Sequence, residues 1–92
     1  PKPFKAPGRD VAASIKSQLW NMKEGGFISE YDYELGSTVA RVLSGGDVDP
    51  GTLITEQYVL DLEREAFVRL CRNQKTVDRI DHMLKTNKPL RN

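Results

Sequence analysis

Glycine pairs and capping residues divide the chain into four short segments of helical periodicity. These helix-stopping and helix-starting residues constrain the fold more than any other feature of the sequence. Gly25-Gly26 and Gly45-Gly46 end two of the segments, and Asn87 followed by Pro89 ends the last. Gly and Asn tolerate positive φ, and proline cannot continue a helix, so such residues stop helices. No stretch alternates β-branched and polar residues as a half-buried strand does. The sequence therefore predicts an all-α fold of four short helices in a small orthogonal bundle.

Each of the four segments has a candidate N-terminal cap and apolar residues at helical spacing. Val11, Ile15, Leu19 and Met22, for instance, recur every three or four residues and so share one helical face. A capping side chain accepts a hydrogen bond from a free N–H of the first turn. The expected helices cover residues 11–24, the segment from Ser29 to the second glycine pair, residues 56–72 and residues 77–86, with Asp10, Ser29, Thr55 and Thr76 as caps.

The first nine residues differ in composition from the rest of the chain. They hold three prolines and one glycine, which sustain neither a helix nor a central strand. We therefore expect residues 1–9 to form a Pro-rich extended arm or linker and residues 10–92 to form one helical domain. A chain of 92 residues has the length of one small domain with a modest core.

Charge and cysteine content exclude several classes of protein. Lys and Arg number 14 and Asp and Glu number 13, and this balance argues against a nucleic-acid-binding surface. No apolar run approaches the roughly 18 residues of a membrane span. The single cysteine, Cys71, allows neither an internal disulfide framework nor a cysteine-based zinc site. It suits a reducing compartment, and we expect a cytoplasmic protein.

No group of side chains is typical of a catalytic, cofactor-binding or metal-binding site. His82 projects onto the polar side of the last helix and has no set of further metal ligands around it. Cys71 has no accompanying base and is interpreted as a small core residue. The glycine pairs follow helices rather than strands and lack the pattern of phosphate-binding loops. We therefore predict no catalytic, cofactor or metal residue in this chain.

Glu63 is expected to be a buried structural acid. It falls within the apolar arc of the third helix, which is formed by Val59, Leu62, Ala66, Phe67 and Leu70. A buried carboxylate is costly unless it is paired or hydrogen-bonded, so Glu63 needs a partner. Arg41 is one candidate, and a lysine or backbone donors are others. A catalytic acid is disfavoured because no second carboxylate, histidine or nucleophile is placed to work with it.

Trp20 points away from the apolar face of the first helix, on the side of Ala13. An exposed tryptophan is common at interfaces. It therefore predicts contact with another chain or an absent part of the same chain, unless Phe4 of the arm folds back and covers it. Gly36 and Ala40 lie four residues apart, so another backbone can approach the second helix closely there.

Several blocks of the sequence together resemble the C-terminal end of bacterial 3-hydroxyacyl-CoA dehydrogenase/enoyl-CoA hydratase proteins of fatty-acid β-oxidation. The resemblance runs from about residue 10 to residue 92, with the blocks in the family's order. The blocks are MKEGGFISEYD (22–32), VLSGGD (42–47), EQYVLDLEREAF (56–67), KT (75–76), RIDHML (79–84) and KPLRN (88–92).

The resemblance implies a non-catalytic, crotonase-type helical tail that belongs to a larger enzyme. Such a tail packs against the rest of its own chain or a neighbouring subunit. The dehydrogenase and hydratase residues, the NAD site and the oxyanion pocket of the family lie in segments that this chain lacks, so the chain alone is expected to be inactive. Phe67, Lys85 and Lys88 occupy the region from which such tails approach a bound CoA.

The alternative is a self-standing helical adaptor that binds a protein through Trp20 and the groove at Gly36 and Ala40. Nucleic-acid binding by the last helix is poorly supported because Asp78 and Asp81 interrupt its basic charge.

Overall fold

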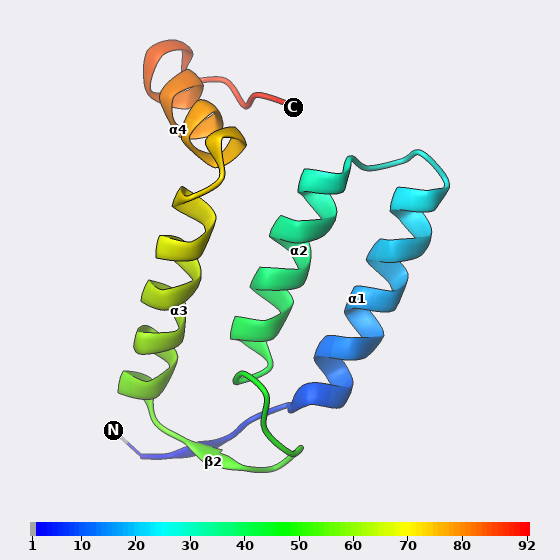
Figure 1. Ribbon diagram of the computed structural model, residues 1–92. Coiled ribbons are helices and arrows are strands. Elements are labelled where there is room, and N and C mark those ends of the chain that lie inside the picture. Colours follow the sequence, from blue (N-terminus) through cyan, green and yellow to red (C-terminus); the bar gives the residue numbers. More distant parts are fainter. Residues whose placement is uncertain (1) are drawn as a thin grey trace.

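The computed structural model describes residues 2–92, which form four helices and one pair of two-residue strands (Figure 1). The all-α fold of four helices is confirmed, whereas the strand pair was not expected. Residue 1 of the expected arm lies outside the described residues. The elements are β1 (Phe4–Lys5), α1 (Arg9–Glu24), α2 (Glu30–Leu43), β2 (Leu53–Ile54), α3 (Glu56–Cys71) and α4 (Gln74–Thr86).

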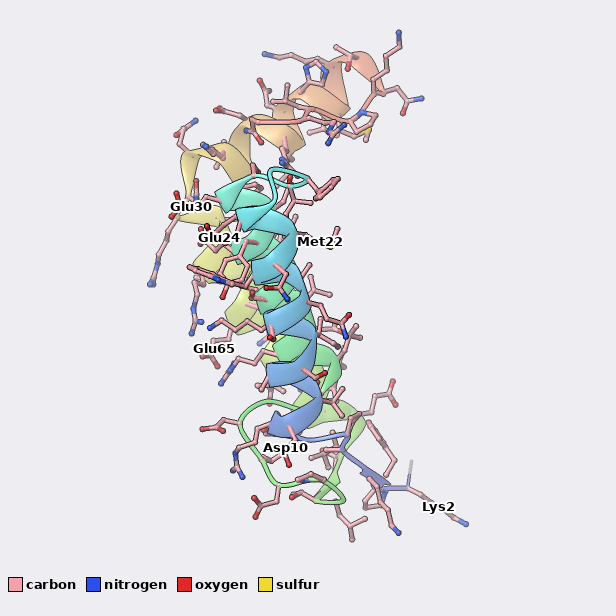
Figure 2. The ribbon with its side chains drawn as sticks, turned by 90° about the vertical axis from the view of Figure 1, so that its right-hand side faces the viewer. Lys2, Asp10, Met22, Glu24, Glu30 and Glu65 are labelled. Carbon is pink, nitrogen blue, oxygen red and sulfur yellow. The ribbon has the colours of Figure 1, made fainter. Side chains whose placement is uncertain are left out.

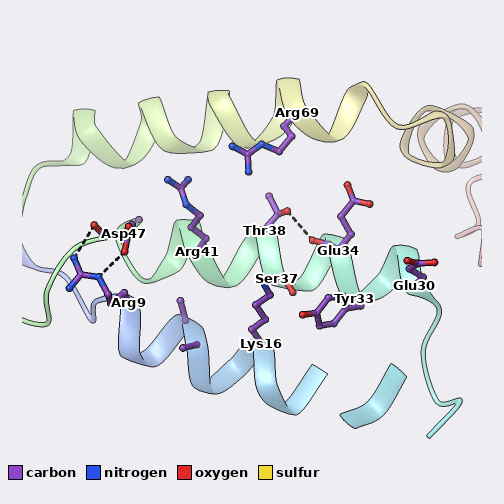
Figure 3. Close-up of a pocket in the computed structure, with 13 residues that line it drawn as sticks. Arg9, Lys16, Glu30, Tyr33, Glu34, Ser37, Thr38, Arg41, Asp47 and Arg69 are labelled. Carbon is purple, nitrogen blue, oxygen red and sulfur yellow. Dashed lines mark hydrogen bonds and ion pairs between the residues drawn. The ribbon is translucent and has the colours of Figure 1, made fainter. Parts of the chain in front are cut away.

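The first three helices lie side by side in a single layer. They run up, down and up, with α2 in the middle contacting both α1 and α3 (Figure 1). The expected orthogonal packing is confined to the junction of α3 and α4, where α4 turns across the layer and is seen end-on in Figure 3. The radius of gyration is 14.8 Å, compared with about 12 Å for a typical globular domain of this length. The helices therefore form a flat molecule of 40 × 30 × 20 Å.

Two of the four expected helix caps are confirmed. Ser29 and Thr55 accept hydrogen bonds from the N–H groups of Asp32 and Tyr58, respectively. Asp32 also completes a capping box by accepting from the N–H of Ser29. At the other end of the chain, Asn87 closes α4 in the expected left-handed conformation, with a φ of 55°.

The caps expected at Asp10 and Thr76 are wrong. Helix α1 begins two residues earlier than expected, after Gly8, whose N–H donates to the carbonyl oxygen of Ser44. Helix α4 is capped by Asn73, whose side chain accepts from the N–H of Lys75. The Thr76 hydroxyl is buried and hydrogen-bonded to the Tyr31 hydroxyl at 2.6 Å, so it serves the junction of α2 and α4 instead of the helix end.

The N-terminal arm is anchored by backbone hydrogen bonds. Strand β1 pairs antiparallel with β2, with Phe4 opposite Ile54. Ala6 then donates to the carbonyl oxygen of Thr52 and accepts from the N–H of Gly51. Two residues per strand are too few to show an alternating pattern, so these strands have no detectable signal in the sequence.

The buried core is small and lies mainly around α2 and at the base of the layer. The expected apolar stripes are only partly covered, because a single layer of helices buries side chains along its seams and leaves its faces open. Val11, Ile15 and Met22 are all exposed, and so is Val39. The buried hydrophobic residues are Ala6, Tyr31, Ala40, Val42, Ile54, Leu62 and Leu70.

The junction between the layer and α4 is fixed by one arginine. The Arg79 guanidinium donates to Asp32 at 2.8 Å and to the side chain and carbonyl oxygen of Asn92. It also lies 4.5 Å from the centre of the Tyr31 ring. The N–H of Ser29 and the guanidinium of Arg79 together lower the pKa of Asp32 below its ordinary value.

We expect this lowered pKa to make the stability of the protein dependent on acidic pH. A group whose pKa is lower in the folded state stabilises the fold above its unfolded pKa, which is 3.8 here, and this stabilisation disappears as pH falls through the folded pKa. The free energy of unfolding should therefore fall as pH drops below about 5. Asp32→Asn should lower stability by about 1 kcal/mol at pH 7 and flatten the pH dependence, as measured by urea unfolding. If the free energy of unfolding of Asp32→Asn fell as steeply below about pH 5 as that of the unsubstituted protein, this assignment would be contradicted.

Candidate functional site

The three-helix layer has two chemically different faces. In Figure 2, which looks onto α1, Glu30 and Glu65 lie on one side of the layer and Met22 lies on the other. The face with the glutamates contains an open cavity of about 670 Å³, which we call the polar groove. It is lined by Arg9, Ala12, Ala13, Lys16, Glu30, Tyr33, Glu34, Ser37, Thr38, Arg41, Gly46, Asp47 and Arg69.

Side chains from three helices converge on the polar groove. Figure 3 shows Arg41 and Arg69 extending from α2 and α3 into the space between these helices. Lys16 extends from α1 toward α2, near Ser37 (Figure 3). At one end of the groove, Arg9 forms an ion pair with Asp47 at 2.7 Å and a second with Asp49. The groove thus carries both signs of charge, with four basic and three acidic side chains in its lining.

The opposite side of the layer is apolar. Val39 and Leu43 are each two residues from Arg41, and residues two apart in a helix point in nearly opposite directions. Phe67 is related in the same way to Arg69. We call this side the apolar face and define it by Val11, Ile15 and Met22 of α1, Val39 and Leu43 of α2, and Phe67 of α3.

The apolar face is uncovered. Leu43 is 70% exposed and Phe67 is 58% exposed. Between them, α2 and α3 form a shallow groove of about 260 Å³, whose other lining residues include Val42, Ala66 and Leu70. Exposed apolar surface of this kind is typical of an interaction site.

Glu63 is exposed and lies at the edge of this shallow groove, so the prediction that it is a buried structural acid is wrong. It has no ion pair or side-chain hydrogen bond to Arg41 or to any other described residue. The helical projection placed Glu63 correctly on the apolar arc of α3. However, nothing within residues 2–92 covers that part of the arc, so the carboxylate needs no buried partner.

Gly36 and Ala40 lie in the seam between α1 and α2, where they are already packed within this chain. A Cβ atom at Gly36 would come within 2.8 Å of the Leu19 side chain, and Ala40 is buried. The expected close approach of a second backbone is therefore made by α1 itself. These two residues form no free groove for an external partner.

Trp20 is 46% exposed, as expected. Its ring lies 5.5 Å from that of Tyr33 in a T-shaped arrangement, and the Lys23 ammonium lies 3.8 Å from its centre. The alternative in which Phe4 covers Trp20 is wrong, because Phe4 is held in β1 opposite Ile54 at the other end of α1. Ala13, on the same side of α1, is exposed and lines the polar groove.

The three residues expected near CoA are not gathered into one site. Phe67 lines the shallow groove of the apolar face, which contains neither lysine. Lys85 lies near the end of α4 and pairs with Asp81 at 2.9 Å, and Lys88 is exposed after that helix.

No metal-binding or membrane-spanning feature occurs among the described residues. Residues 2–92 contain no group of three or more His, Cys, Asp or Glu side chains arranged to hold a metal ion. No helix in this part of the chain combines the length and apolar character needed to span a bilayer. His82 is half-buried and Cys71 is a half-buried free cysteine at the end of α3.

No pattern in the sequence predicts the polar groove. Its residues are ordinary charged and polar side chains on three separate helices, and none departs from its local pattern. Only the antiparallel placement of α1, α2 and α3 brings Lys16, Arg41 and Arg69 to one side. The one available signal was that Arg41 and Arg69 lie on the polar sides of their helices.

The chain is similar over nearly its whole length to one part of a much longer protein. It is 42% identical over 88 residues to a protein from Bacillus subtilis (strain 168) named probable 3-hydroxyacyl-CoA dehydrogenase. The matched region covers 96% of this chain and 11% of that relative. No family model matches the chain, and no solved structure matches it. The expected resemblance to a 3-hydroxyacyl-CoA dehydrogenase is therefore confirmed for a segment of such a protein.

Proposed function

We propose that the chain is a non-catalytic helical domain of a larger 3-hydroxyacyl-CoA dehydrogenase/enoyl-CoA hydratase, and that it packs through its apolar face against the rest of that enzyme or a neighbouring subunit. The observation that carries the proposal is the uncovered apolar face. Most domains bury apolar surface between two packed layers, and residues 2–92 supply only one. The similarity of the chain to 11% of a much longer relative supports the proposal that the second layer lies elsewhere in the parent enzyme.

The finer parts of the proposal rest on the resemblance of the sequence blocks. In this proposal the chain is a crotonase-type C-terminal tail of a cytoplasmic enzyme of fatty-acid β-oxidation. The parent would hydrate an enoyl-CoA and oxidise the 3-hydroxy product with NAD, using residues elsewhere in its chain. The polar groove and the apolar face contain no nucleophile paired with a base, in keeping with a supporting role.

Packing of the apolar face can be tested by cysteine labelling in the full-length native protein. In a Cys71→Ser background, we expect Leu43→Cys and Phe67→Cys to react rapidly with a maleimide in the 92-residue chain, since both positions are exposed. In the full-length protein the same two thiols should react at least about tenfold more slowly, because a second layer covers them.

A matched control is Glu65→Cys, which lies on the opposite face of α3 and is exposed. Its labelling rate should be the same in both proteins. Equal rates for Leu43→Cys in the two proteins would refute the proposed packing. The 92-residue chain should also turn over neither an enoyl-CoA nor a 3-hydroxyacyl-CoA with NAD, and turnover of either would refute the non-catalytic role.

The adaptor alternative is weaker, because the groove that it requires is occupied. Leu19 fills the space at Gly36, and Ala40 is buried. Trp20 remains exposed beside the polar groove, where its contacts with Tyr33 and Lys23 give it a fixed place within this chain.

A further inference from the structure

Two cations of the polar groove are not neutralised by a direct ion pair. Arg9 is paired with Asp47 and Asp49, but Lys16 and Arg41 form no ion pair with any described residue. The pair between Arg69 and Glu65 is 3.6 Å long and exposed, so it contributes little.

The acids of the groove form no ion pair with Lys16 or Arg41. Asp47 is paired with Arg9, and the Glu34 carboxylate accepts a hydrogen bond from the Asn73 amide at 3.2 Å. Glu30 lies eleven residues from Arg41 along α2, which corresponds to about 16 Å. The Arg41 guanidinium, which extends toward α3, is therefore available to bind an anion.

The lining of the groove also contains an unpartnered hydroxyl. The Ser37 hydroxyl oxygen is buried and has no hydrogen-bond partner among the described residues. Ser37 is one helical turn from Arg41 and lines the groove with it. A buried hydroxyl without a partner costs free energy, and a bound acceptor would recover it once the Ser37 side chain rotates toward the groove.

We propose that the polar groove binds the phosphate group of a small phosphorylated ligand through Arg41 and Arg69, which face each other between α2 and α3. Guanidinium groups match phosphate oxygens in a bidentate geometry, and here they extend from both walls of the groove. A phosphate has enough oxygens to bind both guanidinium groups and one further donor, whereas a carboxylate has only two oxygens. The groove volume of about 670 Å³ suits a small molecule, and Tyr33 adds a ring against which its organic part can lie.

This binding is independent of the packing proposed above. The polar groove opens on the face of the layer opposite to Leu43 and Phe67. Phosphate binding can therefore fail while the apolar face is still covered in the full-length protein, and the reverse result is equally possible.

The test is a titration of the 92-residue chain with inorganic phosphate and with phenyl phosphate at constant ionic strength, followed by amide NMR shifts. We expect saturable shifts at Ser37, Arg41 and Arg69, with phenyl phosphate binding at least as tightly as inorganic phosphate. Arg41→Gln combined with Arg69→Gln should weaken binding by at least about tenfold. Ser37→Ala should weaken it about threefold.

The matched control removes two charges from the outer side of α3. Arg64 and Arg72 lie on that surface, which Arg69 borders, but neither lines the polar groove, so Arg64→Gln combined with Arg72→Gln should change the affinity by less than about twofold. Equal weakening by the two pairs of substitutions would show a non-specific charge effect and overturn the site. Binding of a glutamate-rich peptide more tightly than either phosphate would also overturn it, in favour of a protein contact.

Discussion

Gly8→Ala should destabilise the protein by about 3 kcal/mol or more, which is a large fraction of the stability of a domain of this size. Gly8 joins the N-terminal arm to α1 with a φ of 94° and a ψ of 172°, a combination that is almost restricted to glycine. A Cβ atom there would lie 2.5 Å from the backbone nitrogen of Pro50. The backbone cannot move aside as a flexible side chain can. The loop between α2 and β2, which contains Pro50, would therefore have to shift.

The destabilisation by Gly8→Ala has two causes, the positive φ and the contact with Pro50, and Gly51→Ala separates them. Gly51 lies in the same loop with a φ of 83°, but a Cβ atom there meets nothing within 4 Å. It should cost only about 1 kcal/mol, from backbone strain alone. The measurement is urea unfolding followed by circular dichroism. If Gly8→Ala were no more costly than Gly51→Ala, the contact with Pro50 would not constrain the fold.

The sequence predicted the helices well because their signals are local. Ser29 and Thr55 cap their helices as expected, since a hydroxyl next to a free N–H needs no information from the rest of the chain. Thr76 has the same local signal, but its hydroxyl bonds to Tyr31, which is 45 residues away. The cap at Asn73 therefore could not be chosen over Thr76 without the tertiary structure.

Burial was predicted less well, because periodicity identifies the apolar side of a helix and not what covers it. Leu62 and Leu70 are buried in α3, while Phe67 and Glu63 on the same arc are exposed. The seam with α2 covers only part of the arc, and a single layer leaves the remainder open. The polar groove could not be predicted for a similar reason. Its cations come from three helices, and no local sequence pattern indicates how these helices are placed relative to one another.

Leu43→Gln combined with Phe67→Gln should abolish self-association of the 92-residue chain, if the apolar face associates with itself when its proper partner is missing. In a symmetric dimer each substituted residue occurs twice, so four side chains lose their contacts. At about 1 kcal/mol for each partly buried side chain, the loss is about 4 kcal/mol, or about a thousandfold in the dissociation constant. Sedimentation velocity over a range of concentrations measures this change.

The fold itself should tolerate this double substitution. Both residues are already exposed, and glutamine is a good helix former, so the free energy of unfolding should change by no more than about 0.5 kcal/mol per position. Val68→Gln is the matched control, because Val68 is 48% exposed on α3 and lines the outer surface with Arg64 and Arg72. It removes comparable apolar surface outside the apolar face and should leave association unchanged. Loss of association in Val68→Gln, with association retained in the double variant, would place the interface on the wrong side of α3 for the packing proposed here.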